Sequence, residues 1–165
     1  MKNIYLIRHA KSSWKAPVPG DMERPLNKRG ERDAQEMGKR LAERGILPQR
    51  LITSPAKRAM DTCRFIASAL GFPWEKVIIQ PDLYLADEEE FIKVIRDIPG
   101  TIQSAVLFGH NPGITDVSNK LQGPFINEIP TCGLVGCSFN VSDWKNTRFE
   151  EGTLEFMDYP KKKKY

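Results

Sequence analysis

The chain has 165 residues, of which 40% are hydrophobic and 28% are charged, and its formal net charge is +4. These values are typical of one globular domain with a real core, and no apolar run approaches the roughly 20 residues of a membrane-spanning helix. The N-terminus does not resemble a signal peptide, because a short strand-like run after Lys2 ends at Arg8 and His9. We therefore expect a cytoplasmic location.

The positive charge is concentrated at the C-terminal end. Subtracting Lys161 to Lys164 from the 25 basic residues leaves 21, which equals the number of acidic residues. We interpret 1–160 as a single domain and 161–165 as a basic, solvated and disordered tail. A contact of this tail with nucleic acid or an anionic membrane is a less favoured alternative.

Strand and helix signals alternate along the chain. In chain order we predict a strand over 2–8, a loop over 11–27, a helix over 28–44 capped by Asn27, a strand over 50–53, a helix from Pro55 to Gly71, a strand over 77–80, a helix over 88–98 capped by Asp87, a strand over 104–108, a helix near 113–121, and two strands over 133–141 and 152–158 joined by a turn.

This alternation predicts an α/β fold, with a mostly parallel sheet covered by helices on both faces. The last two strands fit an antiparallel pair at one edge. Ligands of such sheets bind beyond the carboxyl ends of the strands, and His9, Ser54 and His110 all follow predicted strands directly. His9 and His110 are the only histidines of the chain.

Three short segments carry chemistry of interest. Arg8 and His9 pair a bidentate phosphate-binding group with an imidazole, Arg58 follows the second strand near a helix N-terminus, and His110 lies in the turn Gly109-His110-Asn111-Pro112-Gly113. Each has an ordinary structural interpretation when taken alone: a surface arginine, a solvent-facing helix arginine or a turn histidine.

A metal site is not expected. Cys63, Cys132 and Cys137 form no CxxC pair, and with only two histidines a structural zinc site is improbable. Cys63 fits a small core residue of the second helix.

Together, in this order and spacing, the segments resemble the histidine phosphatase superfamily, which is phosphoglycerate mutase-like. Its members share an Arg-His-Gly motif, an arginine in a Ser-Pro-x-x-Arg-Ala segment, and a later Gly-His motif. The run Asp21-Met22-Glu23-Arg24-Pro25-Leu26, followed by Gly30, adds a similarity to the small SixA-type phosphohistidine phosphatases. The resemblance extends to at least residue 113 and implies a three-layer α/β/α sandwich. Ala10 stands where most members have glycine, and we expect it to be tolerated.

The resemblance implies a metal-independent phosphatase without a cofactor. His9 would be the nucleophile, and the phosphoryl oxygens would be bound by Arg8, Arg24, Arg58 and His110. For the proton donor we favour Asp21 over Asp82 and Asp87, although neighbouring arginines should lower the pKa of such a carboxylate. Lys11 and Ser12 are either rim contacts to substrate or part of an exposed loop.

The chain has no long insertion that would enclose the site, so we expect an open, shallow site. Such a site suits phosphohistidine on a signalling protein, for example a histidine phosphotransfer domain. The alternatives are a phosphatase for small phosphoesters and a non-catalytic phosphoprotein-binding module. A phosphomutase ranks below these, because it should need a more enclosed pocket.

Overall fold

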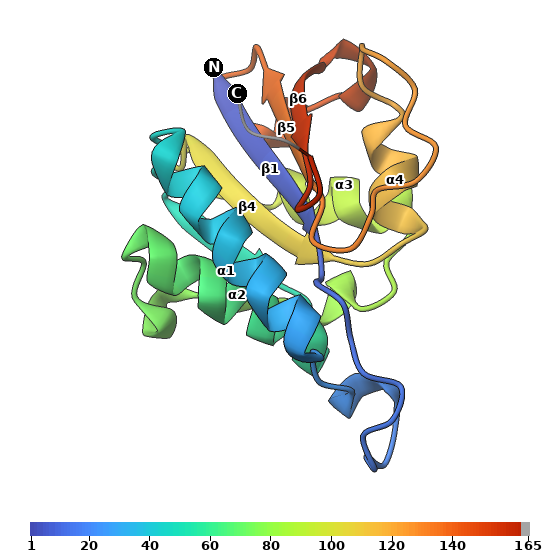
Figure 1. Cartoon of the computed structure of the whole chain (residues 1–165). Coiled ribbons are helices and arrows are strands. Elements are labelled where there is room, and N and C mark those ends of the chain that lie inside the picture. Colours follow the sequence, from blue (N-terminus) through green and yellow to red (C-terminus); the bar gives the residue numbers. More distant parts are fainter. Residues whose placement is uncertain (163–165) are drawn as a thin grey trace.

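The computed structural model describes residues 1–162 (Figure 1). Within them, the strands form one sheet in the order β3-β2-β4-β1-β5-β6. Their bounds are β1 (Lys2–Arg8), β2 (Arg50–Thr53), β3 (Ile78–Ile79), β4 (Ser104–Gly109), β5 (Leu134–Phe139) and β6 (Thr153–Asp158). β3, β2, β4 and β1 are parallel, whereas β5 is antiparallel to both β1 and β6. The predicted mostly parallel sheet with an antiparallel edge is confirmed.

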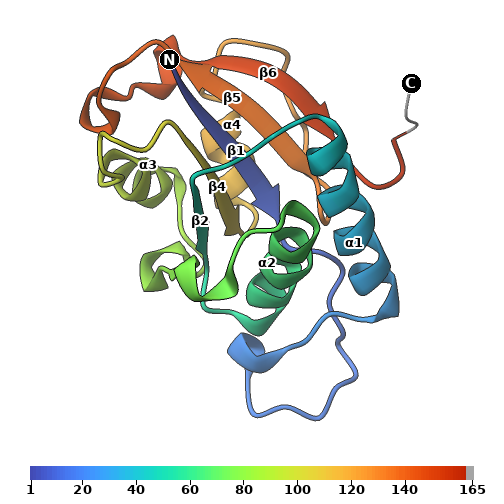
Figure 2. The same ribbon diagram turned by 90° about the vertical axis from the view of Figure 1, so that its left-hand side faces the viewer.

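Helices cover both faces of this sheet, as Figures 1 and 2 show. Their bounds are α1 (Lys28–Glu43), α2 (Lys57–Leu70), α3 (Glu88–Arg96) and α4 (Gly113–Ser118). One apolar cluster joins α1 and α2 to the sheet, and a second joins α3 and α4 to its other face. The layers are therefore helix, sheet and helix, as the α/β/α prediction requires.

The predicted helix ends rest on local hydrogen bonds. The Asn27 side chain accepts from the Gly30 amide at 2.8 Å and caps α1. Asp87 and Glu90 form a reciprocal capping box at the start of α3. Gly71 ends α2 with φ of +68°, a left-handed conformation that glycine adopts without steric cost.

Several elements are shorter than the sequence indicates. β3 has only two residues, because Trp74–Lys76 forms a 3-10 turn before it. α4 stops at Ser118, since the Asn119 side chain both donates to and accepts from the backbone of Ile126, at 2.8 Å each, and leads the chain away. α3 likewise ends at Arg96 rather than at residue 98, and α2 begins two residues after Pro55.

The connection between β5 and β6 is longer than the predicted turn. It contains two 3-10 turns, Trp144–Asn146 and Phe149–Glu151, whose rings Trp144 and Phe149 are buried in the core. Burial of these rings gives the connection an apolar anchor that a tight hairpin would lack.

The C-terminal segment is described only in part. Of the predicted tail over 161–165, residues 163–165 lie outside the described part of the chain. Lys162 Nζ donates a hydrogen bond to the carbonyl of Met157 at 2.7 Å, so at least this lysine packs back on the domain. In residues 1–162, the helices lack the length and hydropathy that crossing a membrane requires.

Candidate active site

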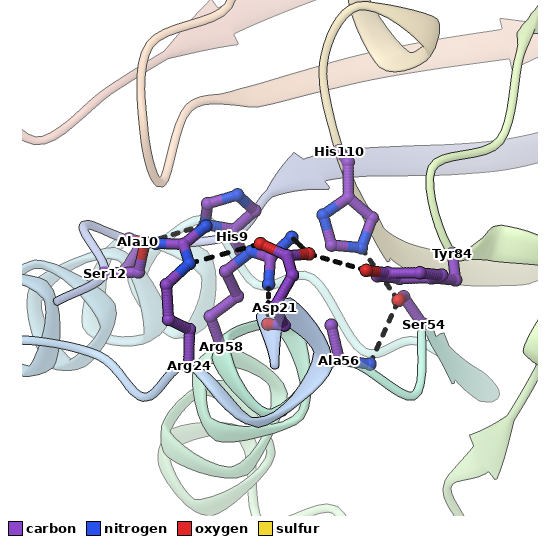
Figure 3. Close-up of polar contacts among 10 residues, drawn as sticks. All are labelled: His9, Ala10, Ser12, Asp21, Arg24, Ser54, Ala56, Arg58, Tyr84 and His110. Atoms are coloured by element: carbon purple, nitrogen blue, oxygen red, sulfur yellow. Dashed lines mark hydrogen bonds and ion pairs between the residues drawn. The ribbon is translucent and has the colours of Figure 1, made fainter. Parts of the chain in front are cut away.

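The sheet brings the two histidines together. β1 and β4 are parallel neighbours with Arg8 opposite Gly109, so His9 and His110 leave the sheet side by side. The His9 amide donates to the Gly109 carbonyl at 3.1 Å, and the two imidazole ring centroids are 5.2 Å apart (Figure 3). They are 8% and 2% exposed, so both rings are largely buried.

The tautomer of His9 follows from its hydrogen bond. Nδ1 lies 2.8 Å from the Ala10 carbonyl oxygen, which can only accept, so Nδ1 carries the proton and Nε2 holds a free lone pair. Burial is the main cause that lowers the pKa of His9 from 6.5 to about 3, and the ring is neutral near pH 7. Ala10 is held in turn by the Thr62 hydroxyl, which accepts from its amide at 3.0 Å. A neutral imidazole with a fixed tautomer is suited to nucleophilic attack.

His110 presents one nitrogen to the site. Its Nε2 lies 2.8 Å from Ser54 Oγ, which already accepts from the Ala56 amide at 3.2 Å. The Ser54 hydroxyl can donate to Nε2, and in that tautomer Nδ1 carries the proton and is a donor. Within residues 1–162, this Nδ1 is buried and has no hydrogen-bond partner. Burial lowers the pKa of His110 to about 4, with Arg58 as the next contributor.

Arg58 projects from the start of α2 and is 3% exposed. Its Nη1 donates to the Asp21 carbonyl at 2.8 Å, and its Nη2 donates to Asp21 Oδ2 at 3.0 Å. Its Nε is buried and has no partner among the described residues. The end of the guanidinium is therefore occupied, while its side remains available for an anion.

Arg8, the last residue of β1, is held by the segment that precedes β5. Its Nη1 donates to the Ile129 carbonyl at 2.9 Å and lies 3.7 Å from Glu128, a carboxylate that the sequence did not single out. Arg8 Nε is buried and lacks a partner in the described part of the chain. Burial lowers the pKa of Arg8, and Glu128 partly offsets this effect.

Arg24 reaches the site from the loop after β1. Its Nε donates to Asp21 Oδ1 at 3.2 Å, and its Nη1 donates to Ser12, which is buried beneath it. The exposed ring of Trp14 stacks on the guanidinium at 3.7 Å. Of the two predicted rim residues, Ser12 is thus a partner of Arg24, whereas Lys11 is exposed.

Asp21 lies in the site, beside the arginines, as predicted. The hydroxyl of Tyr84 donates to its Oδ2 at 2.6 Å, and together with Arg58 and Arg24 it lowers the pKa of Asp21 to about 2. The lowered pKa makes Asp21 a weaker proton donor, as its neighbouring arginines led us to expect, and its role as the donor stays a prediction. Asp87, a predicted alternative, caps α3.

Tyr84 is a site residue that the sequence reasoning missed. Its ring stands edge-on to His110, with centroids 5.7 Å apart. Tyr84 comes after β3 and immediately after the 3-10 turn Pro81–Leu83, at the same carboxyl edge of the sheet as the other site residues. The rule that placed His9 and Ser54 at this edge could have indicated it. No group of three or more His, Cys, Asp or Glu side chains in residues 1–162 is arranged to hold a metal ion.

The fold and this arrangement of arginines and imidazoles agree with similarities to known proteins. Residues 4–84 match the model of the histidine phosphatase superfamily, branch 1. An uncharacterised chloroplastic protein of Arabidopsis thaliana is 30% identical over 139 residues, which is 79% of this chain and 63% of that protein. The match thus covers less than two thirds of the plant relative.

Solved structures extend the similarity to the whole domain. The SixA protein of Agrobacterium tumefaciens superposes with a TM-score of 0.81 at 25% identity, covering 96% of this chain and 98% of that one. A protein histidine phosphatase SixA in complex with tungstate has the same TM-score at 19% identity, covering 96% and 97%, and supports the fold. The family match over residues 4–84 and the match to the whole domain together support an assignment to the histidine phosphatase superfamily. Within that superfamily its structure is SixA-like.

Proposed function

We propose that this chain is a phosphatase that takes a phosphoryl group onto His9, and that its substrate is phosphohistidine on a signalling protein. In this proposal Arg8, Arg24, Arg58 and His110 bind the phosphoryl oxygens. The reaction needs no metal, because the arginines supply the positive charge that stabilises the transferring group.

The observation that carries the proposal is a set of buried nitrogen atoms left without partners. Arg8 Nε, Arg58 Nε and His110 Nδ1 have no hydrogen-bond partner in the described chain. Arg58 and Arg8 both contribute through their charges to the lowered pKa of His9. A buried donor without a partner costs free energy, roughly 1–3 kcal/mol each. A phosphoryl group in front of His9 would satisfy such donors.

The chemistry follows from the state of His9. Its Nε2 lone pair forms a bond to phosphorus while the bond from phosphorus to the leaving group breaks. Water then attacks phosphorus and loses a proton, the P–Nε2 bond breaks, and inorganic phosphate is released with His9 restored. The hydrogen bond from Nδ1 to the Ala10 carbonyl stabilises the positive charge that the ring gains in the first step.

The ionised Asp21 supports the choice of substrate. Alkyl esters leave as poor alkoxides and need a proton from the enzyme, for which Asp21 is a weak donor. Phosphohistidine that is protonated on its other ring nitrogen leaves as neutral imidazole without an enzyme acid. Small phosphoesters are therefore the weaker alternative.

Substitution of the nucleophile is the direct test. A panel of a phosphohistidine protein, a phosphotyrosine peptide and a sugar phosphate should show turnover highest on phosphohistidine. His9→Ala should lower kcat by about 10⁴-fold or more. Turnover that survives His9→Ala would disprove the nucleophile, and preference for the sugar phosphate would disprove the substrate class. Binding of a phosphoprotein without turnover by the unmodified chain would instead indicate a non-catalytic module.

A further inference from the structure

Tyr84 contacts both His110 in the candidate active site and Asp21 in the loop after β1. It comes from the segment after β3, whereas Asp21 comes from the loop after β1, 63 positions away in sequence. Its hydroxyl donates to Asp21 Oδ2 at 2.6 Å, and this donation raises the pKa of the phenol above its usual value of 10. The Tyr84 hydroxyl therefore stays protonated near neutral pH and donates to the ionised carboxylate of Asp21.

Asp21, in turn, accepts hydrogen bonds only from the end of the Arg58 guanidinium. A guanidinium binds acceptors either at its end, through both Nη atoms, or along its side, through Nε and one Nη. Asp21 takes the end, with its carbonyl on Nη1 and its Oδ2 on Nη2. Arg58 Nε, on the free side, is buried and has no partner within residues 1–162.

The Asp21 Oδ2 atom is thus the point where two contacts meet. It receives a hydrogen bond from Tyr84 on one side and from Arg58 on the other (Figure 3). If the tyrosine hydroxyl were removed, Asp21 Oδ2 would keep only Arg58 as a donor, and the carboxylate, which is 41% exposed at its side chain, would be held by Arg24 and Arg58 alone. Arg58 would keep the Asp21 carbonyl on Nη1, but the acceptor on Nη2 would be less firmly fixed, and with it the direction of Nε.

We propose that Tyr84 is a positioning residue of this site: through Asp21 it fixes Arg58 so that the Nε edge of the guanidinium faces the phosphoryl group. The inference rests on the proposed phosphatase function and adds a residue to it. Tyr84 does not itself bind the phosphoryl oxygens in this arrangement, because its proton is committed to Asp21.

The test is a double-mutant cycle on kcat with Tyr84→Phe, Asp21→Asn and the combined variant. One hydrogen bond to a charged group corresponds to about a tenfold change, so Tyr84→Phe should lower kcat about tenfold and change KM less than threefold. Because Tyr84 acts through Asp21, it should have little further effect in the Asp21→Asn background. The matched control is Tyr5→Phe in β1, where the Tyr5 ring packs against Phe156 of β6, and it should keep wild-type kinetics.

A second measurement does not depend on turnover. The Nε–H resonance of Arg58, assigned by its loss in Arg58→Lys, should shift when inorganic phosphate is added to the unmodified protein. In Tyr84→Phe that shift should be reduced or absent. Additive effects of the two substitutions on kcat, or an unchanged phosphate-induced shift in Tyr84→Phe, would overturn the role of Tyr84.

The two proposals fail in distinguishable ways. If the unmodified protein has no turnover on any phosphorylated substrate, the phosphatase function fails, while the Arg58 resonance still decides whether Tyr84 positions the arginine. If turnover depends on His9 but the cycle is additive, the phosphatase stands and the inference about Tyr84 falls.

Discussion

Two buried arginines in this domain have the same charge and similar burial, yet their surroundings differ. Arg40, in α1, is 8% exposed and Arg58, in α2, is 3% exposed. All three nitrogens of Arg40 are paired: Nε with Glu36 at 3.2 Å, Nη1 with Asp158 at 3.0 Å, and Nη2 with the carbonyl of Pro160 at 2.9 Å. Arg58 keeps a buried Nε without a partner in the described chain.

This difference separates a structural ion pair from a binding site. Arg40 ties α1 to the end of β6 and the residues after it, and each of its nitrogens already has a partner within the domain. Arg58 is hydrogen-bonded only through its two Nη atoms, so its Nε–H can still donate to a ligand. Incomplete pairing of a buried charge costs stability, and proteins retain such arrangements at functional sites.

Loss of Arg58 should have the largest effect. Arg58→Ala removes a charged donor from the phosphoryl group, and kcat/KM should fall by about 10²–10³-fold. Steady-state kinetics with phosphohistidine protein measures this, with Arg64→Ala in the same helix as the control, since Arg64 stacks on Trp74 instead. An equal loss in both variants would show that the helix, not the guanidinium, is responsible.

Loss of Arg40 should affect stability and spare the chemistry. Arg40→Met leaves the buried Asp158 with only the more distant Arg44, at 3.8 Å, as a charge partner, and the free energy of unfolding should fall by up to about 3 kcal/mol. Urea denaturation gives this value, and kcat/KM at a temperature where the variant is folded should stay within about twofold of wild type. A large loss of phosphate affinity would contradict the separation of the two arginines.

The candidate active site, with its two histidines, should also make the stability of the domain depend on pH more than the Arg40 ion pair does. The pKa values of about 3 for His9 and about 4 for His110 are lower than the usual 6.5, so below pH 6.5 the unfolded chain binds protons that the native state does not. The free energy of unfolding should therefore fall as the pH is lowered from 6.5 to 4, by up to about 1.4 kcal/mol per pH unit for each histidine.

Urea denaturation at several pH values between 7 and 4 measures this slope. The double variant with both His9 and His110 replaced by Gln should show a shallower dependence over the same interval. An unchanged slope in that variant would mean that other groups cause the loss of stability.

Much of the fold was accessible from sequence because its signals are local. The caps at Asn27 and Asp87 and the glycine stop at Gly71 depend on neighbouring residues only, and all are observed. The predicted C-terminal end of α4 and the predicted turn between β5 and β6 were wrong, because both depend on partners outside the element. Asn119 meets Ile126, and Trp144 donates from its indole Nε1 to the carbonyl of Ile102 at 2.7 Å.

The prediction of the site had a similar limit. The sequence indicated that His9 and His110 end strands, and the register between β1 and β4 then brings the rings within 5.2 Å. Asp21 was correctly placed near the arginines, but its role depended on how many donors reach its carboxylate. Tyr84 was missed because a single tyrosine after a short strand has no distinctive pattern.

The sequence by itself determined the residue types of a phosphoryl site, their order, and their attachment to strand ends of an α/β domain. These follow from local propensity and from the rule that parallel strands end at a common edge. Only the tertiary structure decided which nitrogens are satisfied, and that Tyr84 donates to Asp21 and helps to lower its pKa. Hydrogen-bond saturation and pKa depend on burial and on side chains far apart in sequence, so they arise only when the chain is folded.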